Sequence, residues 1–200
     1  MQGKKFVLSY SGGKDSVLAL DRMVRQGHRP VGLLVTFCEE EQCSWFHRIP
    51  RAVLSQLEES LDIPMTLVAT GGDDYVENFE NALRCFKQEG AEAVVFGDID
   101  IQEHYDWCHT RCTNTGLESI FPLWGEDRKA VVDELIDLGF EAVITIVNTK
   151  KLDEQYIGNT LTKDTAAQIF ADGADICGEN GEYHTLVVAG PLFKKAIRIP

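Results

Sequence analysis

Near the N-terminus, six consecutive residues combine the groups that bind phosphate. They are Ser11, Gly12, Gly13, Lys14, Asp15 and Ser16, here called the glycine loop. Adjacent glycines let a backbone approach phosphate oxygens closely, and the lysine and hydroxyls add a positive charge and hydrogen-bond donors. The carboxylate of Asp15 can help to hold a Mg²⁺ ion. A Walker loop has four residues between its first glycine and its Gly-Lys pair, so the spacing predicts a phosphate site of another kind.

A second polar stretch lies far along the chain, at residues 177–185, here called the polar loop. Its members are Cys177, Gly178, Glu179, Asn180, Gly181, Glu182, Tyr183, His184 and Thr185. Glu179, Glu182 and His184 are candidate catalytic groups, and the two carboxylates, three residues apart, could converge on one cation. Two alternatives stay open: the run Glu-Asn-Gly-Glu also forms ordinary turns, and His184 could be a structural histidine.

Alternating apolar runs and helical periods must position these two loops. Continuous apolar runs predict strands at 6–8, 31–37, 66–69 and 93–96, and helical spacing predicts helices at 16–26, 49–61 and 74–88. This βαβα series predicts a parallel sheet with both faces covered. The glycine loop then lies between the first strand and the first helix, whose N-terminus exposes free N–H groups to an anion.

The second half of the chain continues the pattern less regularly. We expect helices at 128–138 and 163–172, a strand at 142–147, and a short antiparallel pair of 185–189 with 196–199 around Gly190-Pro191. We place a boundary between an N-terminal nucleotide-binding domain, 1–100, and a C-terminal substrate-binding region, 101–200. It falls within a segment, 101–116, that offers no clear linker.

Composition and charge narrow the function classes. The 200 residues carry 19 Lys and Arg against 32 Asp and Glu, for a formal net charge of −13. Such a surface repels phosphate backbones, so we expect no direct nucleic-acid partner. No apolar run reaches the roughly 18 residues of a membrane span. Six cysteines at irregular spacing favour reduced thiols, and we expect a cytoplasmic protein.

Two candidate ligand residues lie elsewhere in the chain. Asp98 follows the strand expected at 93–96, at the carboxyl edge where α/β sheets bind ligands. His47 follows the second strand, where we expect an adenine to lie, although it could also be a solvent-facing loop histidine. The group His104, Cys108, His109 and Cys112 suggests zinc, but no second cysteine pair of matching spacing supports it. The run Glu39-Glu40-Glu41 is read as a solvated loop.

The glycine loop resembles the PP-loop, SGGxDS, of ATP pyrophosphatases, and the polar loop resembles the GENGEYHT signature of the diphthine–ammonia ligase family. Gly97-Asp98-Ile99, Pro122-Leu123-Trp124, His47 and the segment 190–193 agree with that family. The segment 104–109 lacks the Tyr-Gln-Arg run of eukaryotic members and is similar to the shorter prokaryotic branch.

The resemblance implies an α/β fold of the adenine nucleotide alpha hydrolase type, which is Rossmann-like, with a small C-terminal α+β region. It implies that a carboxylate is adenylated by ATP with Mg²⁺, and that ammonia then displaces AMP to form an amide. In the family, the acceptor is the diphthine side chain of elongation factor two. Lys14 and Asp15 would act with the glycine loop, and His47, Gly97 and Asp98 would help to bind ATP. Residues 178–185 would bind the acceptor.

Other assignments remain open on sequence grounds. A PP-loop enzyme of the tRNA thiolation or lysidine type would share the glycine loop, and so would a nucleotide-binding sensor without catalysis. Position 2 is Gln rather than the Cys of an N-terminal amidotransferase, so we expect ammonia from solution or from a partner. The sequence is compatible with a homodimer but does not establish one.

Overall fold

A mostly parallel sheet of six strands forms the centre of the computed structural model, which describes residues 3–69, 71 and 74–199. Gln2 therefore lies outside the described residues. The strands are β1 (Lys5–Ser9), β2 (Arg29–Cys38), β3 (Cys43–Ser44), β4 (Met65–Ala69), β5 (Ala93–Val95) and β6 (Glu118–Ile120). β4, β2, β1, β5 and β6 lie side by side in parallel, and β3 pairs antiparallel with the end of β2. The predicted α/β fold with a parallel sheet is confirmed.

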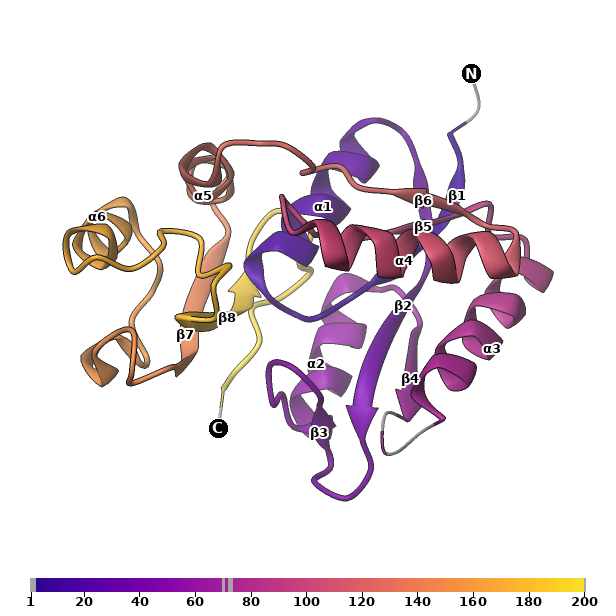
Figure 1. Cartoon of the computed structure of the whole chain (residues 1–200), viewed down its shortest axis with the longest axis horizontal. Coiled ribbons are helices and arrows are strands. Elements are labelled where there is room, and N and C mark those ends of the chain that lie inside the picture. Colours follow the sequence, from indigo (N-terminus) through magenta and orange to yellow (C-terminus); the bar gives the residue numbers. More distant parts are fainter. Residues whose placement is uncertain (1–2, 70, 72–73, 200) are drawn as a thin grey trace.

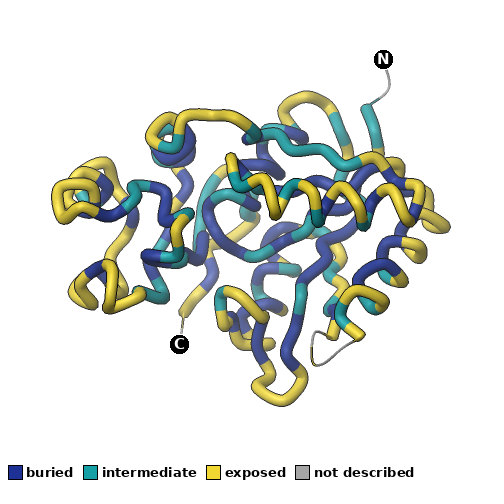
Figure 2. The backbone as a smooth tube through the Cα atoms, viewed as in Figure 1, coloured by how far each residue is buried: buried dark blue, intermediate teal, exposed yellow. Residues whose placement is uncertain are grey.

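Helices cover both faces of the sheet, as Figure 1 shows. They are α1 (Lys14–Arg25), α2 (Arg51–Leu61), α3 (Tyr75–Gln88) and α4 (Gln102–Thr115). Alternate residues of each strand point to opposite faces: Phe6 and Leu8 pack with α1 and α2, whereas Val7 packs with α3 and α4. In Figure 2 much of the backbone of the central strands is coloured as buried, as expected for strands that lie between two apolar layers.

The strand order creates a switch point between β1 and β5. The chain builds β1, β2 and β4 toward one edge, and then returns to place β5 and β6 on the other side of β1. At the carboxyl ends of these strands, the chain leaves β1 for α1 on one face of the sheet and leaves β5 for α4 on the other face. Open α/β sheets bind ligands in the crevice that forms there.

The C-terminal part forms a second, smaller layer at one end of the molecule (Figure 1). It contains α5 (Arg128–Asp137), β7 (Glu141–Val147), a 3₁₀ turn η1 (Glu154–Tyr156), α6 (Lys163–Ala171) and β8 (Tyr183–Ala189). β7 and β8 pair antiparallel over their whole lengths. Its apolar side chains continue the same core as α1 and α2.

Some sequence predictions of the elements are wrong. The strand at 185–189 pairs with β7 rather than with 196–199. Among the described residues, one backbone hydrogen bond connects those two segments, from Ile197 N–H to the Val188 carbonyl (2.8 Å). β7 and β8 are both seven residues long and can pair along their whole lengths, whereas the segment 196–199 has only four residues. The sequence reading also missed α4 and β6, and it started α1 at 16, two residues late.

The domain boundary near residue 100 stays a prediction, and β6 still belongs to the large sheet at residues 118–120. Across the described residues, we find no helix with the length and apolar character that crossing a bilayer requires.

Candidate active site

The glycine loop turns sharply between β1 and α1. Gly12 has a φ of +80°, which favours glycine, and its carbonyl accepts a hydrogen bond from the N–H of Val187 in β8 (2.9 Å). Gly13 is the N-cap of α1 and has no side chain to bond the first-turn N–H groups. A Cβ on Gly13 would lie 2.4 Å from Cε1 of His47. The N-cap residue itself therefore places no side chain over the N-terminus of α1, and a helix N-terminus is where an anion can bind.

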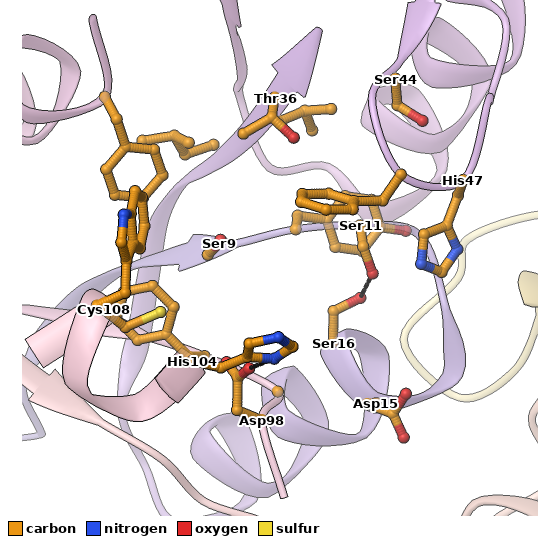
Figure 3. Close-up of a pocket in the computed structure, with 18 of the residues that line it drawn as sticks. Ser9, Ser11, Asp15, Ser16, Thr36, Ser44, His47, Asp98, His104 and Cys108 are labelled. Carbon is orange, nitrogen blue, oxygen red and sulfur yellow. Dashed lines mark hydrogen bonds and ion pairs between the residues drawn. The ribbon is translucent and has the colours of Figure 1, made fainter. Parts of the chain in front are cut away.

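Hydroxyl groups brace the loop from within. The N–H of Gly13 donates to Ser11 Oγ (3.3 Å), and Ser16 Oγ donates to the carbonyl of Gly13 (3.0 Å). Ser11 Oγ also lies 3.2 Å from Ser16 Oγ, as Figure 3 shows. Both hydroxyls face the space beyond the loop and are placed to meet phosphate oxygens.

Gly97, just past β5, brings the next strand end against the start of α1. A Cβ at this position would lie 2.8 Å from the backbone nitrogen of Ser16 and 2.8 Å from the carbonyl carbon of Asp15. Backbone atoms cannot move aside as a flexible side chain can. Glycine is thus required for the close approach of the two segments that flank the switch point.

Lys14 joins the glycine loop to the polar loop. Its Nζ lies 2.8 Å from Asp15 Oδ2, 3.8 Å from Glu179 Oε1 and 5.8 Å from the ring centroid of Tyr183. Its backbone N–H donates to Oγ1 of Thr185 (3.1 Å). Burial alone would lower the pKa of Lys14, but the nearby negative charges, Asp15 foremost, raise it well above its usual value. The ammonium group is therefore held charged beneath the two loops.

Asp15, Cys177 and Glu179 bring potential ligand atoms within 4.8 Å of one another. The Cys177 thiol lies 3.8 Å from Asp15 Oδ1, and burial raises its pKa, so it stays a neutral thiol. Burial, and then the charge of Asp15, raise the pKa of Glu179 to about 7. Two carboxylates suit a hard cation such as Mg²⁺, whereas a neutral thiol does not. Asp15 and Glu179 are the residues here that fit Mg²⁺.

Glu182, by contrast, binds the polar loop's own backbone. Its carboxylate accepts hydrogen bonds from the N–H of Asp175 (3.4 Å) and from the N–H of Asn180 (3.1 Å). The phenol of Tyr183 donates to the carbonyl of Ile176 (2.6 Å). Gly178 and Gly181 provide positive φ angles for the turns. Glu179 and Glu182 therefore do not meet at one cation as their spacing suggested, and Glu182 holds the loop's shape.

Two histidines lie together beside the glycine loop. The ring centroids of His47 and His184 are 4.8 Å apart, and His47 Nδ1 lies 2.9 Å from the Thr185 carbonyl. Because a carbonyl only accepts, Nδ1 of His47 carries the hydrogen. Burial and the neighbouring His184 lower the pKa of His47 to about 4, and burial also lowers the pKa of His184. Both imidazoles are neutral at pH 7.

A cavity of about 470 Å³ opens over the carboxyl ends of β1, β2 and β5. Of the sequence-predicted site residues, eight line it: Ser11, Asp15, Ser16, His47, Gly97, Asp98, Glu179 and His184. Figure 3 shows Asp15, Ser16, His47 and Asp98 arranged around this space. The other predicted residues are not part of the cavity lining: Gly12, Gly13, Lys14, Gly178, Asn180, Gly181, Glu182, Tyr183 and Thr185. Lys14 is buried and contacts the lining residues Asp15 and Glu179.

Sequence reasoning missed one wall of the cavity, which is aromatic. It consists of Tyr75, Phe79, Phe96 and Trp107, with Cys108 beside them. Tyr75 and Trp107 stack with centroids 5.5 Å apart and planes 9° from parallel. The spacing of Tyr75 and Phe79, four residues apart on α3, could have indicated an aromatic helical face. Trp107 lies on α4, a helix that was not predicted from the sequence. This wall suits a flat ring or an apolar chain.

Asp98 lies at the cavity edge, and its Oδ1 is 3.3 Å from Nδ1 of His104 (Figure 3). Burial raises the pKa of Asp98, although His104 opposes that shift. Cys108 and Cys112 belong to the apolar layer between the sheet and α4. Within the described part of the chain, the group of potential metal ligands consists of Asp15, Cys177 and Glu179 and includes neither of these cysteines.

Comparisons with known proteins cover nearly the whole chain. Residues 3–119 match the diphthamide synthase N-terminal domain, and residues 127–200 match the diphthamide synthase C-terminal domain. The diphthine–ammonia ligase of Mus musculus is 26% identical over 212 residues, covering 94% of this chain and 79% of the mouse protein. That of Schizosaccharomyces pombe is 27% identical over 209 residues, covering 94% of this chain. The chain spans only 34% of the length of the S. pombe protein.

Among solved structures, a predicted subunit of tRNA methyltransferase from Methanocaldococcus jannaschii has a similar fold. The match covers 97% of this chain and 100% of that one, with a TM-score of 0.52 and 14% sequence identity. At this identity the likeness concerns the fold alone.

Proposed function

The chain belongs to the diphthamide synthase family, and we propose that it is an ATP-dependent amide ligase that adenylates a carboxylate and transfers it to ammonia. One observation carries the proposal: the buried Lys14 joins the glycine loop to Glu179 of the polar loop at the edge of the cavity. The two sequence motifs, separated by more than 150 residues, thus form one site.

The glycine loop supports binding of the pyrophosphate portion of ATP. The N-terminus of α1 offers the positive end of the helix dipole and first-turn N–H groups beyond that of Lys14, which donates to Thr185. Ser11 and Ser16 offer hydroxyls. Lys14 adds a positive charge next to Asp15 of the same loop. Charge that develops on a departing pyrophosphate would be stabilised by these fixed groups, which need no reorganisation during the reaction.

Asp15 and Glu179 are the residues that would hold Mg²⁺. When bound, the ion would neutralise phosphate charge, which is its usual contribution to nucleotide chemistry. Burial, and then the neighbouring charge of Asp15, raise the pKa of Glu179 to about 7, and a bound cation would offset the repulsion between the two carboxylates.

In the first half-reaction, an oxygen of the acceptor carboxylate attacks the α-phosphorus of ATP, and the bond from that phosphorus to pyrophosphate breaks. The cavity lining includes both the glycine loop and the aromatic wall, and we propose that the phosphates of ATP lie at the former. The acidic rim at Asp98 and Glu179 favours an acceptor that carries a positive group beside its carboxylate.

In the second half-reaction, the nitrogen of ammonia attacks the acyl carbon, the bond from that carbon to AMP breaks, and one proton must leave the nitrogen. His184 lines the cavity and is neutral at pH 7, so it can accept this proton. His47 packs against His184 and holds the Thr185 carbonyl, which fixes the orientation of the pair. Ammonia would come from solution or from a partner.

The acceptor is proposed to be diphthine, after the name of the curated relatives, and it would be carried on elongation factor two. The test is to incubate the protein with Mg-ATP and ammonia, with and without diphthine-bearing elongation factor two. Formation of AMP and pyrophosphate in equal amounts, dependent on the acceptor, is the expected result. ADP and phosphate as products, or AMP formation that tRNA rather than elongation factor two stimulates, would contradict the proposal.

A further inference from the structure

We propose that Arg128 is a positioning residue that fixes Glu179 in the site by bridging the carboxyl edge of the sheet to the polar loop. This inference rests on the proposed function for its effect on turnover, but the bridge itself is a property of the fold. Arg128 does not line the cavity, and neither the motifs nor the family resemblance singled it out.

Arg128 is held in place by the helix that it begins. It is the first residue of α5, and the N-cap side chain of Asp127 accepts a hydrogen bond from the N–H of Ala130 (2.9 Å). An N-cap of this kind fixes where a helix starts. The position of the Arg128 backbone is thereby set, and the contacts of its guanidinium with two carboxylates fix the side chain.

The guanidinium contacts two carboxylates from different parts of the chain. Its Nε and Nη2 donate to the two oxygens of Asp100, both at 2.7 Å, and its Nη1 donates to Oδ2 of Asp175, also at 2.7 Å. Asp100 follows the Gly97-Asp98 segment beyond β5, and Asp175 precedes the polar loop. A planar guanidinium can make this bidentate contact and still reach a second carboxylate, whereas an ammonium group cannot reproduce the fork.

Asp175 connects Arg128 to the polar loop through hydrogen bonds from the loop's backbone. Its Oδ2 accepts a hydrogen bond from the backbone N–H of Glu179 (2.8 Å), and its Oδ1 accepts one from the N–H of Cys177 (3.3 Å). The Glu179 carboxylate then lies 3.8 Å from Lys14 Nζ. The chain of contacts thus runs from Asp100 through Arg128 and Asp175 to the residue that completes the site.

The ion pair between Arg128 and Asp175 is partly shielded from solvent, so it can contribute to the order of the polar loop. The exposed fractions of the side chains are 25% for Arg128 and 11% for Asp175, well below those of most other ion pairs on this protein. Exposed pairs contribute little because water and salt screen them. A partly buried pair that also receives two backbone N–H groups orders the loop more strongly.

The first experiment measures hydrogen exchange in a peptide that covers residues 175–182. The variants are Arg128→Gln, Arg128→Lys and, as a matched control, Arg22→Gln. Arg22 is also partly buried and joins two helices through Glu134, but it has no contact with the polar loop. We expect exchange in this peptide to be at least tenfold faster in R128Q, intermediate in R128K, and unchanged in R22Q.

The second experiment measures steady-state release of pyrophosphate by the same variants. Because displacement of a reacting group by about 1 Å can lower a rate a hundredfold, we expect R128Q to lose at least tenfold in kcat. The KM for Mg-ATP should rise by a smaller factor than kcat falls, since Glu179 is one of the two carboxylates proposed to hold Mg²⁺ whereas the glycine loop is untouched. R128K should recover part of the rate. The kcat of Asp100→Asn, which keeps Arg128 but weakens its bidentate contact with residue 100, should lie between those of R128Q and the wild type.

The outcomes separate the two proposals. If the wild type releases no pyrophosphate, the proposed function fails, while hydrogen exchange still tests the bridge. Unchanged exchange in R128Q would overturn the bridge. Fast exchange in R128Q with an unchanged kcat, or an equal loss of kcat in R22Q, would overturn the positioning role.

Discussion

Lys14 shows how a residue can be central to a site without lining its cavity. Its ammonium group contacts Asp15 and Glu179, and its backbone N–H contacts Thr185. The sequence indicated that Lys14 belongs to a phosphate site. It could not predict the pairing with Glu179, because a contact between residues 165 positions apart depends on the whole fold.

Replacing Lys14 by Met is expected to affect both stability and activity. The variant leaves two neighbouring carboxylates without their cation, so the free energy of unfolding should fall by about 2 kcal/mol, less than for a fully buried pair because Asp15 is partly exposed. The kcat for pyrophosphate release should fall at least a hundredfold, as for loss of a preorganised charge. Urea denaturation and a pyrophosphate assay measure the two effects. Lys129→Met, at an exposed ion pair, is the control. An active K14M would argue against the assignment.

His47 gives the protein a pH dependence whose sign follows from its pKa. The pKa is about 4 in the folded protein and 6.5 for a free imidazole, so the unfolded chain binds the proton more tightly. The stabilisation from neutral His47 is complete above pH 6.5 and is lost as pH falls toward 4, by up to about 3 kcal/mol. Glu179, with a raised pKa, acts in the opposite sense, so only the difference between variants is diagnostic.

The measurement is the free energy of unfolding at pH 7, 5.5 and 4 for the wild type, His47→Gln and the control His109→Gln. His109 is exposed on α4. The wild type and the control should lose more stability than H47Q between pH 7 and 4. Parallel pH profiles for all three proteins would show that His47 is not the responsible group.

At the scale of elements, the sequence predicted what local periodicity determines. The first strands and helices were predicted because apolar residues recur at the proper spacing, as in β2 and α3. α4 was missed because its buried face is made of Cys108, Cys112 and Thr115 rather than aliphatic residues. The partner of β8 was missed because strand pairing is long-range. The site depends on both kinds of information, since β8 carries His184 to the start of α1.

Gly97→Ala tests the close approach of the β5 connection to α1. The new Cβ would lie within 3.0 Å of three backbone atoms of Asp15 and Ser16, so one of the two segments must move. We expect the free energy of unfolding to fall by about 2 kcal/mol, as for overpacking. The affinity for Mg-ATP, measured by calorimetry, should fall at least tenfold because the N-terminus of α1 is displaced. Gly71→Ala, where a Cβ would have no described atom within 4 Å apart from its chain neighbours, should change neither quantity. Equal effects in both variants would refute the packing argument.

For the whole molecule, the net charge of −13 restricts where an anion can bind. At the glycine loop the ammonium group of Lys14 lies between the carboxylates of Asp15 and Glu179, and Asp98 and Glu103 add further carboxylates to the cavity lining. From the net charge we expect binding of one compact polyanion at the glycine loop rather than of an extended phosphate backbone.

A titration with tRNA tests this at the scale of the molecule. At physiological salt, we expect no saturable binding at tRNA concentrations up to about 10 μM, since even non-specific affinities of basic proteins are only of this order. Mobility shift or fluorescence anisotropy would measure it, with Mg-ATP as the positive control for a folded site. Saturable submicromolar binding would favour a tRNA-modifying enzyme instead.

The central claim is that a carboxylate oxygen of the acceptor attacks the α-phosphorus of ATP in this cavity. Its most direct test uses an acceptor whose carboxylate is labelled with ¹⁸O, with mass spectrometry of the AMP produced in the presence of ammonia. The account predicts one ¹⁸O atom in the phosphate of each AMP formed. AMP without the label, or label transferred to inorganic phosphate together with formation of ADP, would contradict it.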